Sequence, residues 1–274
     1  MTDISNYMDA VAEVARIAGD IANAYYGKSP EIHTKADGSP VTVADLAAEQ
    51  AAREWIEQRF PNDGILGEEL PLVRPGATRR WILDPIDGTY TFLQQVPLWG
   101  TLIAVAEGES VIAGAAYFPA VDEIIVAASG EGCWWNGSRA RVSTVADLSE
   151  ARLVTTDARF MRDRVRRERW TRLQEGARTM RTWGDCYGYL LVATGRADIM
   201  VDDVISDWDG AALMPIITEA GGEFTDWRGR PTAFGGDAIA TNAALGGIVR
   251  EILARSEGET LALSSAVAST RTGS

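Results

Sequence analysis

The sequence predicts a layered α/β protein, and three observations carry that prediction. Segments with apolar residues at helical spacing alternate with short apolar runs that are typical of strands. The chain has 274 residues, of which 46% are hydrophobic, so it is long enough to bury a large core. Neither an internal repeat nor a Pro/Gly/Ser-rich linker divides its body. We therefore expect one domain over residues 1–256, made of two fused α/β halves at about 1–145 and 146–256.

The first half predicts two helices followed by an antiparallel meander. Apolar residues recur at helical spacing over residues 3–26, and Gly27 is expected to cap the end of this first helix. A second helix is expected to begin at Pro40 and to run to about Phe60. The strands expected next are residues 64–67, a run ending at 81–83, and residues 100–106, 110–118 and 123–128, followed by a Gly-rich hairpin at 130–137.

The second half alternates helices with strands. Helical spacing predicts helices over residues 162–175, 186–195, 208–220 and 243–255. Short apolar runs predict strands over residues 152–155, 198–201 and 237–241. The segment 257–274 is rich in Ser, Thr and Ala and aperiodic, so we expect it to be a disordered tail.

Charge and cysteine content exclude several classes of function. The formal net charge is −13, which disfavours nucleic acid and anionic membranes as partners, so an anionic substrate would need metal ions or backbone dipoles. Cys133 and Cys186 form neither a disulfide framework nor a zinc motif, and we expect both to be buried in a reducing compartment. No leader or long apolar stretch is seen, which indicates a cytoplasmic protein. The single histidine, His33, lies in a polar stretch, which disfavours mechanisms that need two histidines.

The most informative segment follows the apolar run 81–83 and reads Asp84-Pro85-Ile86-Asp87-Gly88-Thr89. Pro85 favours an extended conformation at Asp84 and cannot donate to a sheet, so the strand is expected to end there. Two hard oxygen donors on a stiff turn suit Mg²⁺ shared with a substrate phosphate. The plain alternative is a surface turn, because all these residue types favour turns.

Three other acids lie in comparable positions at the ends of elements. Glu68 follows a strand, Asp45 lies one turn into a helix, and Asp209 lies at a helix start. Each alone is explained by solvation or by the favourable placement of a negative charge near a helix N-terminus. Together with the Asp84–Asp87 pair they make four acidic segments at the ends of elements, which these separate explanations account for less well.

The motifs, in order, resemble those of the inositol monophosphatase superfamily of Mg²⁺-dependent phosphomonoesterases. They are Val41-Thr42-x-x-Asp45, Gly67-Glu68-Glu69, Trp81-Ile82-x-Asp84-Pro85-Ile86-Asp87-Gly88-Thr89 and Trp208-Asp209-(x9)-Glu219-Ala220-Gly221-Gly222. The resemblance implies an αβαβα sandwich, usually dimeric, and a small phosphorylated substrate.

The resemblance also implies a role for each motif residue. The implied ligands of two catalytic Mg²⁺ ions are Glu68, Asp84, the Ile86 carbonyl, Asp87 and Asp209. Asp45 would contribute to a third site, Gly88 and Thr89 would hold the phosphate, and Thr89 and Glu68 would orient and deprotonate the attacking water. One departure is that Tyr90-Thr91-Phe92 stands where the family usually has Asn-Phe, which affects the expected detail of the phosphate loop.

The segment Gly184-Asp185-Cys186-Tyr187 is similar to the histidinol-phosphate phosphatase branch of the family. A cationic leaving group favours carboxylate partners, which makes Asp185 and Asp202 candidates for substrate recognition, with Trp183 or Tyr187 stacking on the imidazole. The alternative is that Asp185 caps the following helix. We expect hydrolysis of L-histidinol phosphate. The alternatives are a phosphatase of inositol 1-phosphate or another cyclitol or sugar phosphate, and an inactive binding homologue.

Overall fold

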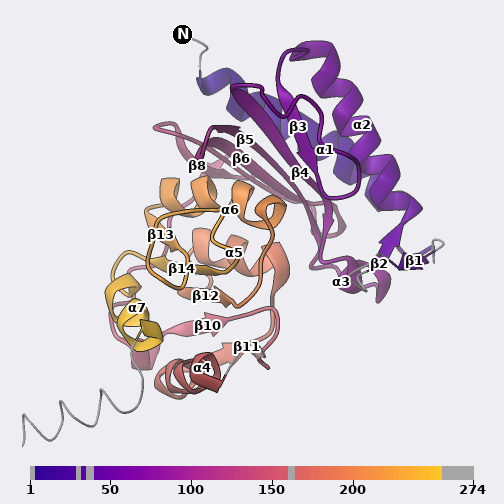
Figure 1. The fold of residues 1–274 in the computed structure, drawn as a ribbon. Helices are drawn as coiled ribbons and strands as arrows, with labels where there is room; N and C mark the ends of the chain where they lie inside the picture. The colour runs from indigo at the N-terminus through magenta and orange to yellow at the C-terminus, as the bar shows by residue number, and fades with distance from the viewer. Residues whose placement is uncertain (1–3, 29–31, 35–39, 160–163, 255–274) are drawn as a thin grey trace, which may run out of the picture.

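Five layers of helices and sheets make up the computed structural model, which describes residues 4–28, 32–34, 40–159 and 164–254 (Figure 1). A seven-stranded sheet and a five-stranded sheet alternate with three pairs of helices. The helix pairs, from the outer face of the larger sheet onward, are α1 (Ile4–Asn23) with α2 (Val43–Arg59), α5 (Asp185–Ala193) with α6 (Asp207–Glu219), and α4 (Arg164–Gly176) with α7 (Gly246–Ala254). The predicted layered α/β class and its αβαβα order are confirmed.

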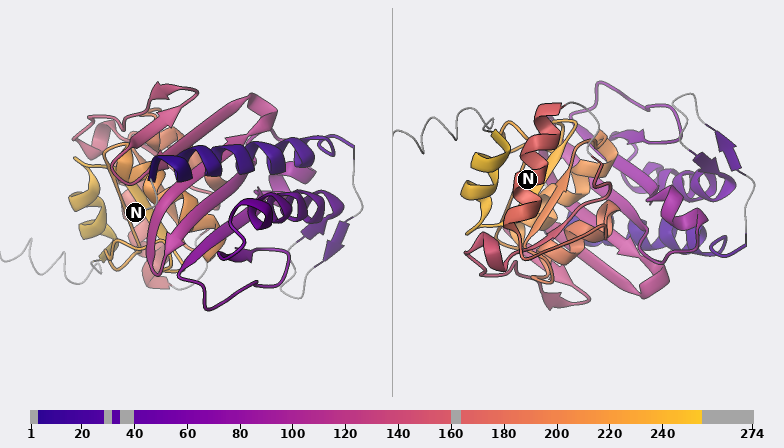
Figure 2. Two further views of the ribbon diagram at one scale, coloured as in Figure 1. Left: turned by 90° about the horizontal axis from the view of Figure 1, so that it is seen from above. Right: turned by 90° about the horizontal axis from the view of Figure 1, so that it is seen from below.

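The seven-stranded sheet contains the predicted meander. Its strands, in spatial order, are β3 (Gly64–Gly67), β4 (Arg79–Asp87), β5 (Gly100–Glu107), β6 (Ser110–Phe118), β7 (Glu123–Ala128), β8 (Gly132–Trp135) and β9 (Ser138–Arg139). Only the β3–β4 pair is parallel, and each later strand pairs antiparallel with the one before it. Figure 2 shows α1 and α2 running side by side across one face of this sheet.

Strand β4 presents alternate residues to two different cores. Trp81 and Leu83 belong to the core beneath α1 and α2, whereas Ile82 belongs to the central core beneath α6. This alternation follows from the two-residue period of a strand, because β4 is covered on both faces.

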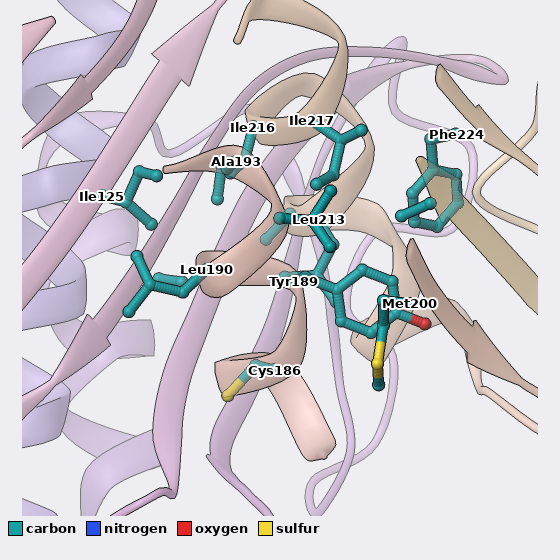
Figure 3. Close-up of a cluster of buried hydrophobic side chains, with 14 of the residues drawn as sticks. Ile125, Cys186, Tyr189, Leu190, Ala193, Met200, Leu213, Ile216, Ile217 and Phe224 are labelled. Atoms are coloured by element: carbon teal, nitrogen blue, oxygen red, sulfur yellow. The ribbon is translucent and has the colours of Figure 1, made fainter. Parts of the chain in front are cut away.

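The five-stranded sheet closes the central layer from the other side. Its strands, in spatial order, are β11 (Thr179–Arg181), β10 (Arg152–Val154), β12 (Ile199–Asp202), β14 (Ala238–Asn242) and β13 (Gly222–Thr225). Side chains of α5, α6 and both sheets interdigitate between them, as Figure 3 shows for Tyr189, Leu213 and Phe224. Helix α6 lies so close to β6 that a Cβ added at Gly114 would be 2.4 Å from the Ala212 carbonyl oxygen.

One sequence prediction about β4 is wrong. The strand does not end at Asp84 but continues to Asp87, because a bulge absorbs the proline. Asp84 pairs with Leu102 and Asp87 pairs with Gly100, so Pro85 and Ile86 have no partner in that register. A bulge is one of the few places where a sheet tolerates a residue without an N–H.

The start of the second helix also differs from the prediction. Pro40–Thr42 forms a short strand, β2, paired with β1 (Ile32–Thr34), and α2 begins only at Val43. Thr42 is the N-cap of α2 and forms a capping box with Asp45, which fixes where the helix starts. The last helix likewise begins later than expected, at Gly246.

Several short elements were not anticipated. They are β1, β2, β11, β13 and the 3₁₀ turns η1 (Pro119–Val121) and η2 (Leu148–Glu150). The short helix α3 (Thr89–Leu93) directly follows Gly88. The expected tail, residues 257–274, lies outside the described residues, and the division of the chain into folding units stays a prediction. Within the described part, no helix is long and apolar enough to cross a membrane.

Candidate metal and substrate site

Three carboxylates meet where the end of β4 faces the start of α6. Asp84, Asp87 and Asp209 each offer an oxygen within 4.8 Å of the other two. The pKa of Asp84 is raised well above its ordinary value, first by burial and then by the charges of Glu68 and Asp87. Burial and nearby acids also raise the pKa of Asp209, to about 7. Such a cluster needs protons or cations to offset its repulsion.

Backbone N–H groups from different segments orient these three carboxylates. Asp84 accepts from the Ile86 N–H at 3.0 Å. Asp87 accepts from the Cys186 N–H, at the start of α5, at 2.5 Å. Asp209 accepts from the Ser206 N–H at 2.7 Å as part of a capping box. The predicted helix N-terminal role of Asp209 therefore coexists with its place in the cluster.

Glu68 approaches the cluster from the turn after β3. Its N–H donates to the Leu83 carbonyl at 3.1 Å, which ties this turn to β4. It lies outside the group of three, but its negative charge contributes to the raised pKa of both Asp84 and Asp209. The structure therefore brings Glu68 within electrostatic reach of the cluster.

A buried carboxylate that sequence reasoning missed anchors the turn of Glu68. Glu49 is fully buried in α2 and accepts from the Glu69 N–H at 2.8 Å, while Arg53 donates to it at 2.7 Å. A Cβ at Gly67 would lie 2.0 Å from the Glu49 carboxylate, so only glycine fits there. In the sequence, Glu49 looks like any polar residue of an amphipathic helix.

Asp45 is fully buried at the start of α2 and has one satisfied oxygen. Its Oδ2 accepts from the Thr42 N–H at 2.8 Å and from the Thr42 hydroxyl at 2.6 Å. Its Oδ1 is buried and has no hydrogen-bond partner among the residues that the structure describes, and burial raises the pKa of its carboxyl group. A buried acceptor in this state is costly unless a cation or water meets it.

The loop after β4 combines a freed carbonyl with a tight turn. The bulge removes Ile86 from the sheet register, and its carbonyl accepts from the Thr89 hydroxyl at 3.1 Å. Gly88 has a φ of 83°, which favours glycine, and is the N-cap of α3. A Cβ there would lie 2.8 Å from Asp185 Oδ2. The loop predicted to hold phosphate thus lies against the predicted recognition carboxylate.

Asp185 does not cap the helix that it begins. The N-cap of α5 is Gly184, and no side chain caps it, so the capping alternative is wrong. Instead, Asp185 Oδ2 accepts from the Thr91 hydroxyl at 2.8 Å. Thr91 belongs to the segment Tyr90-Thr91-Phe92, where the sequence departs from the family pattern that it resembles.

The other recognition candidates lie in different surroundings. Asp202 is 5% exposed, and its two oxygens accept from the Tyr189 hydroxyl and the Thr156 N–H. The ring of Tyr187 packs edge-on against Phe118 inside the protein. Trp183, the other residue predicted to stack on the substrate, is 48% exposed. His33 lies in β1, and Cys133 and Cys186 are free and buried, as expected.

The donor set fits a hard divalent cation. Carboxylate oxygens, together with the Ile86 carbonyl, are the ligands that Mg²⁺ prefers. The close approach of Asp84, Asp87 and Asp209 and the unpartnered Asp45 oxygen are both relieved by positive charge.

Comparison with known proteins gives a consistent answer. The chain matches the model of the inositol monophosphatase family over residues 3–261. A histidinol-phosphatase of Chlorobaculum parvum is 41% identical over 236 residues, covering 85% of this chain and 91% of that protein. A histidinol-phosphatase of Mycobacterium tuberculosis is 39% identical over 219 residues, covering 78% and 84%. The solved structure of an inositol monophosphatase from Zymomonas mobilis superposes with a TM-score of 0.83 at 32% identity, covering 93% of this chain and 100% of that one.

Proposed function

This chain belongs to the inositol monophosphatase family, and from that premise we propose that it hydrolyses L-histidinol phosphate to L-histidinol and phosphate. It is a phosphoric monoester hydrolase of a family that is generally Mg²⁺-dependent. The substrate assignment is supported by the two relatives named histidinol-phosphatase. The observation that carries it is the Asp185 carboxylate beside the phosphate loop, because a cationic leaving group favours a carboxylate there.

We propose that Asp84, Asp87, Asp209, Glu68 and the Ile86 carbonyl hold two Mg²⁺ ions, with Asp45 contributing to a third. A bound divalent ion lowers the pKa of a coordinated water and neutralises phosphoryl charge. The protein's own part is to fix its acids: backbone N–H groups orient Asp84, Asp87 and Asp209 before any ligand arrives. Such preorganisation removes a cost that would otherwise fall on the reaction.

The phosphate and the water are assigned to the loop after β4 and to Glu68. Gly88 lets the backbone approach the phosphoryl oxygens because it has no side chain, and its φ of 83° favours glycine at this turn. Thr89 is held by its hydrogen bond to Ile86, which aims its hydroxyl at the same region as the carboxylates. Glu68 is the nearby acid that takes the proton of the attacking water, as the family pattern implies.

We also propose a cytoplasmic homodimer. The free, buried cysteines Cys133 and Cys186 support a reducing compartment. The dimer rests on the family resemblance and is tested by light scattering of the purified protein.

The first experiment is phosphate release with Mg²⁺, comparing L-histidinol phosphate with myo-inositol 1-phosphate at equal concentrations. We expect a kcat/KM preference of about a hundredfold for the former, which corresponds to roughly 2.7 kcal/mol of transition-state discrimination. Asp185→Asn should raise KM for L-histidinol phosphate much more than for glycerol 2-phosphate, whose leaving group is uncharged. A preference for inositol phosphate would overturn the substrate assignment and leave the metal chemistry standing.

The alternative substrate is inositol 1-phosphate or a related cyclitol or sugar phosphate. The likeness to the Zymomonas mobilis inositol monophosphatase favours it, at a lower identity than that of the two histidinol-phosphatases. An inactive homologue is disfavoured, because an inactive protein would have no chemical need for the full set of acids that this chain retains. Asp84→Asn or Asp87→Asn should abolish turnover by removing a metal ligand, and substantial residual activity would contradict the two-metal assignment.

A further inference from the structure

Asp185 has a backbone conformation that is uncommon for residues other than glycine, although aspartate tolerates it better than most. Its φ is 48°, in the left-handed region that side chains with a Cβ seldom occupy. Its carboxylate does not cap α5, so the helix start does not hold it in place. Contacts with other elements must therefore stabilise this conformation.

Two threonines from separate parts of the chain provide those contacts. The Thr91 hydroxyl, in α3, donates to Asp185 Oδ2 at 2.8 Å. The Thr156 hydroxyl, after β10, accepts from the Asp185 N–H at 2.9 Å. A Cβ at Gly184 would lie 2.2 Å from Thr156 Cα, so the two backbones touch at a glycine. One threonine thus fixes the carboxylate, and the other fixes the backbone that carries it.

Thr156 also connects Asp185 to Asp202. Its N–H donates to Asp202 Oδ1 at 3.1 Å, and the Tyr189 hydroxyl donates to Asp202 Oδ2 at 2.9 Å. Asp202 is 5% exposed and uses both oxygens within the protein. These contacts make Asp202 a support for Thr156 rather than a surface for a ligand.

Unlike Asp202, Asp185 has one carboxylate oxygen, Oδ1, that accepts no hydrogen bond from the described residues. Over the described residues, Thr91 is the hydrogen-bond donor to its side chain, and it reaches Oδ2 rather than Oδ1. Next to Asp185 lies a cavity of about 460 Å³, lined among others by Tyr90, Thr91, Thr156 and Gly184. Cavities of a few hundred Å³ accommodate small molecules.

We propose that Thr91 and Thr156 are positioning residues that set substrate specificity by aiming the Asp185 carboxylate at the cation of the leaving group. Asp202 acts through Thr156 and does not contact the substrate. This inference rests on the proposed function, because it concerns how that site recognises a cationic phosphoester.

The test compares Thr91→Val, which removes the hydroxyl and keeps the side-chain shape, with Thr91→Ser, which restores it. Kinetics are measured on L-histidinol phosphate and on glycerol 2-phosphate with Mg²⁺. A charge-assisted hydrogen bond predicts that T91V raises KM for L-histidinol phosphate about tenfold. The kcat on this substrate and the KM for glycerol 2-phosphate should be nearly unchanged. T91S should return KM to near the wild-type value, and T156V with T156S should behave in the same way.

Two further variants separate positioning from general damage. Thr171 is exposed on α4, and its hydroxyl donates to the Arg167 carbonyl of the same helix, so T171V is the matched control and should change neither KM. If Thr91 acts only through Asp185, the double variant T91V/D185N should be no worse than D185N. Should T91V not fold, T91A carries the same comparison.

The outcomes distinguish this inference from the proposed function. If the wild-type enzyme shows no preference for L-histidinol phosphate, both the proposed function and the inference fall. If the preference is present but T91V raises KM equally for both esters, or adds to the effect of D185N, the inference alone is overturned.

Discussion

Asp209→Asn should stabilise the metal-free protein at the same time as it abolishes turnover. The pKa of Asp209 is raised by burial from 3.8 to about 7. The folded apoprotein therefore binds a proton that the unfolded chain releases, so its stability falls as the pH rises from about 4 to about 7. A difference of about three pKa units corresponds to a penalty on the order of 4 kcal/mol above pH 7, which an uncharged asparagine avoids.

The assay is thermal unfolding in EDTA at pH 8 and pH 5, repeated with Mg²⁺. Even half of the penalty predicts a rise in Tm of about 4–8 °C at pH 8 for a chain of this size, and a smaller rise at pH 5. Mg²⁺ should raise the Tm of the wild type more than that of the variant, which lacks one of the proposed ligands and retains the others. Asp207→Asn, an exposed change on the same first turn of α6, is the control and should keep the Mg²⁺ response. An Asp209→Asn protein that is no more stable in EDTA at pH 8, or whose Tm rises with Mg²⁺ as much as that of the wild type, would refute this account of the cluster.

Three other changes test neighbouring features. Gly88→Ala should lower kcat on the order of a hundredfold, because its φ of 83° disfavours alanine and the added carbon would displace the phosphate loop; near-normal kcat would contradict this. Glu49→Gln places a donor against backbone N–H groups that anchor the turn of Glu68, so the Mg²⁺ concentration for half-maximal activity should rise severalfold in a metal titration. Burial raises the pKa of Asp198, but hydrogen bonds from Arg152 and a serine outweigh it, so the net pKa is lowered. The stability that this ion pair adds is present above about pH 4 and is lost as the pH falls through the lowered pKa, and Asp198→Asn should remove about 2 kcal/mol of it in urea unfolding at pH 7 and progressively less at lower pH.

The layer order and the acid cluster were predictable because their signals are local. Helical and strand periodicities lie within single elements, and the pair Asp84 and Asp87 stands three residues apart in one motif. Only the family resemblance linked that pair to Asp209, since nothing in the spacing of residues fixes how α6 docks on β4.

The features that were missed depend on contacts between distant segments. Thr91 and Asp185 are 94 residues apart, and Thr156 is an ordinary polar residue until the fold places it beside Asp185. The bulge at Pro85 was missed for a different reason. Proline correctly indicated an interruption of the ladder, but pairing with β5 resumes at Asp87, so the strand continues past it. Edge strands such as β11 are too short to show a period of two.

The acid cluster joins the two halves of the chain, since β4 supplies two of its members and α6 the third. We therefore expect neither half to hydrolyse phosphate esters by itself. Cutting the chain in the exposed segment Ala146-Asp147 would divide the cluster between two fragments. Phosphate release from a mixture of those fragments would then report their reassociation, which Mg²⁺ should favour because acids of both fragments would bind it. The same arrangement makes this fold a natural starting point for a two-part molecular reporter whose output is released phosphate.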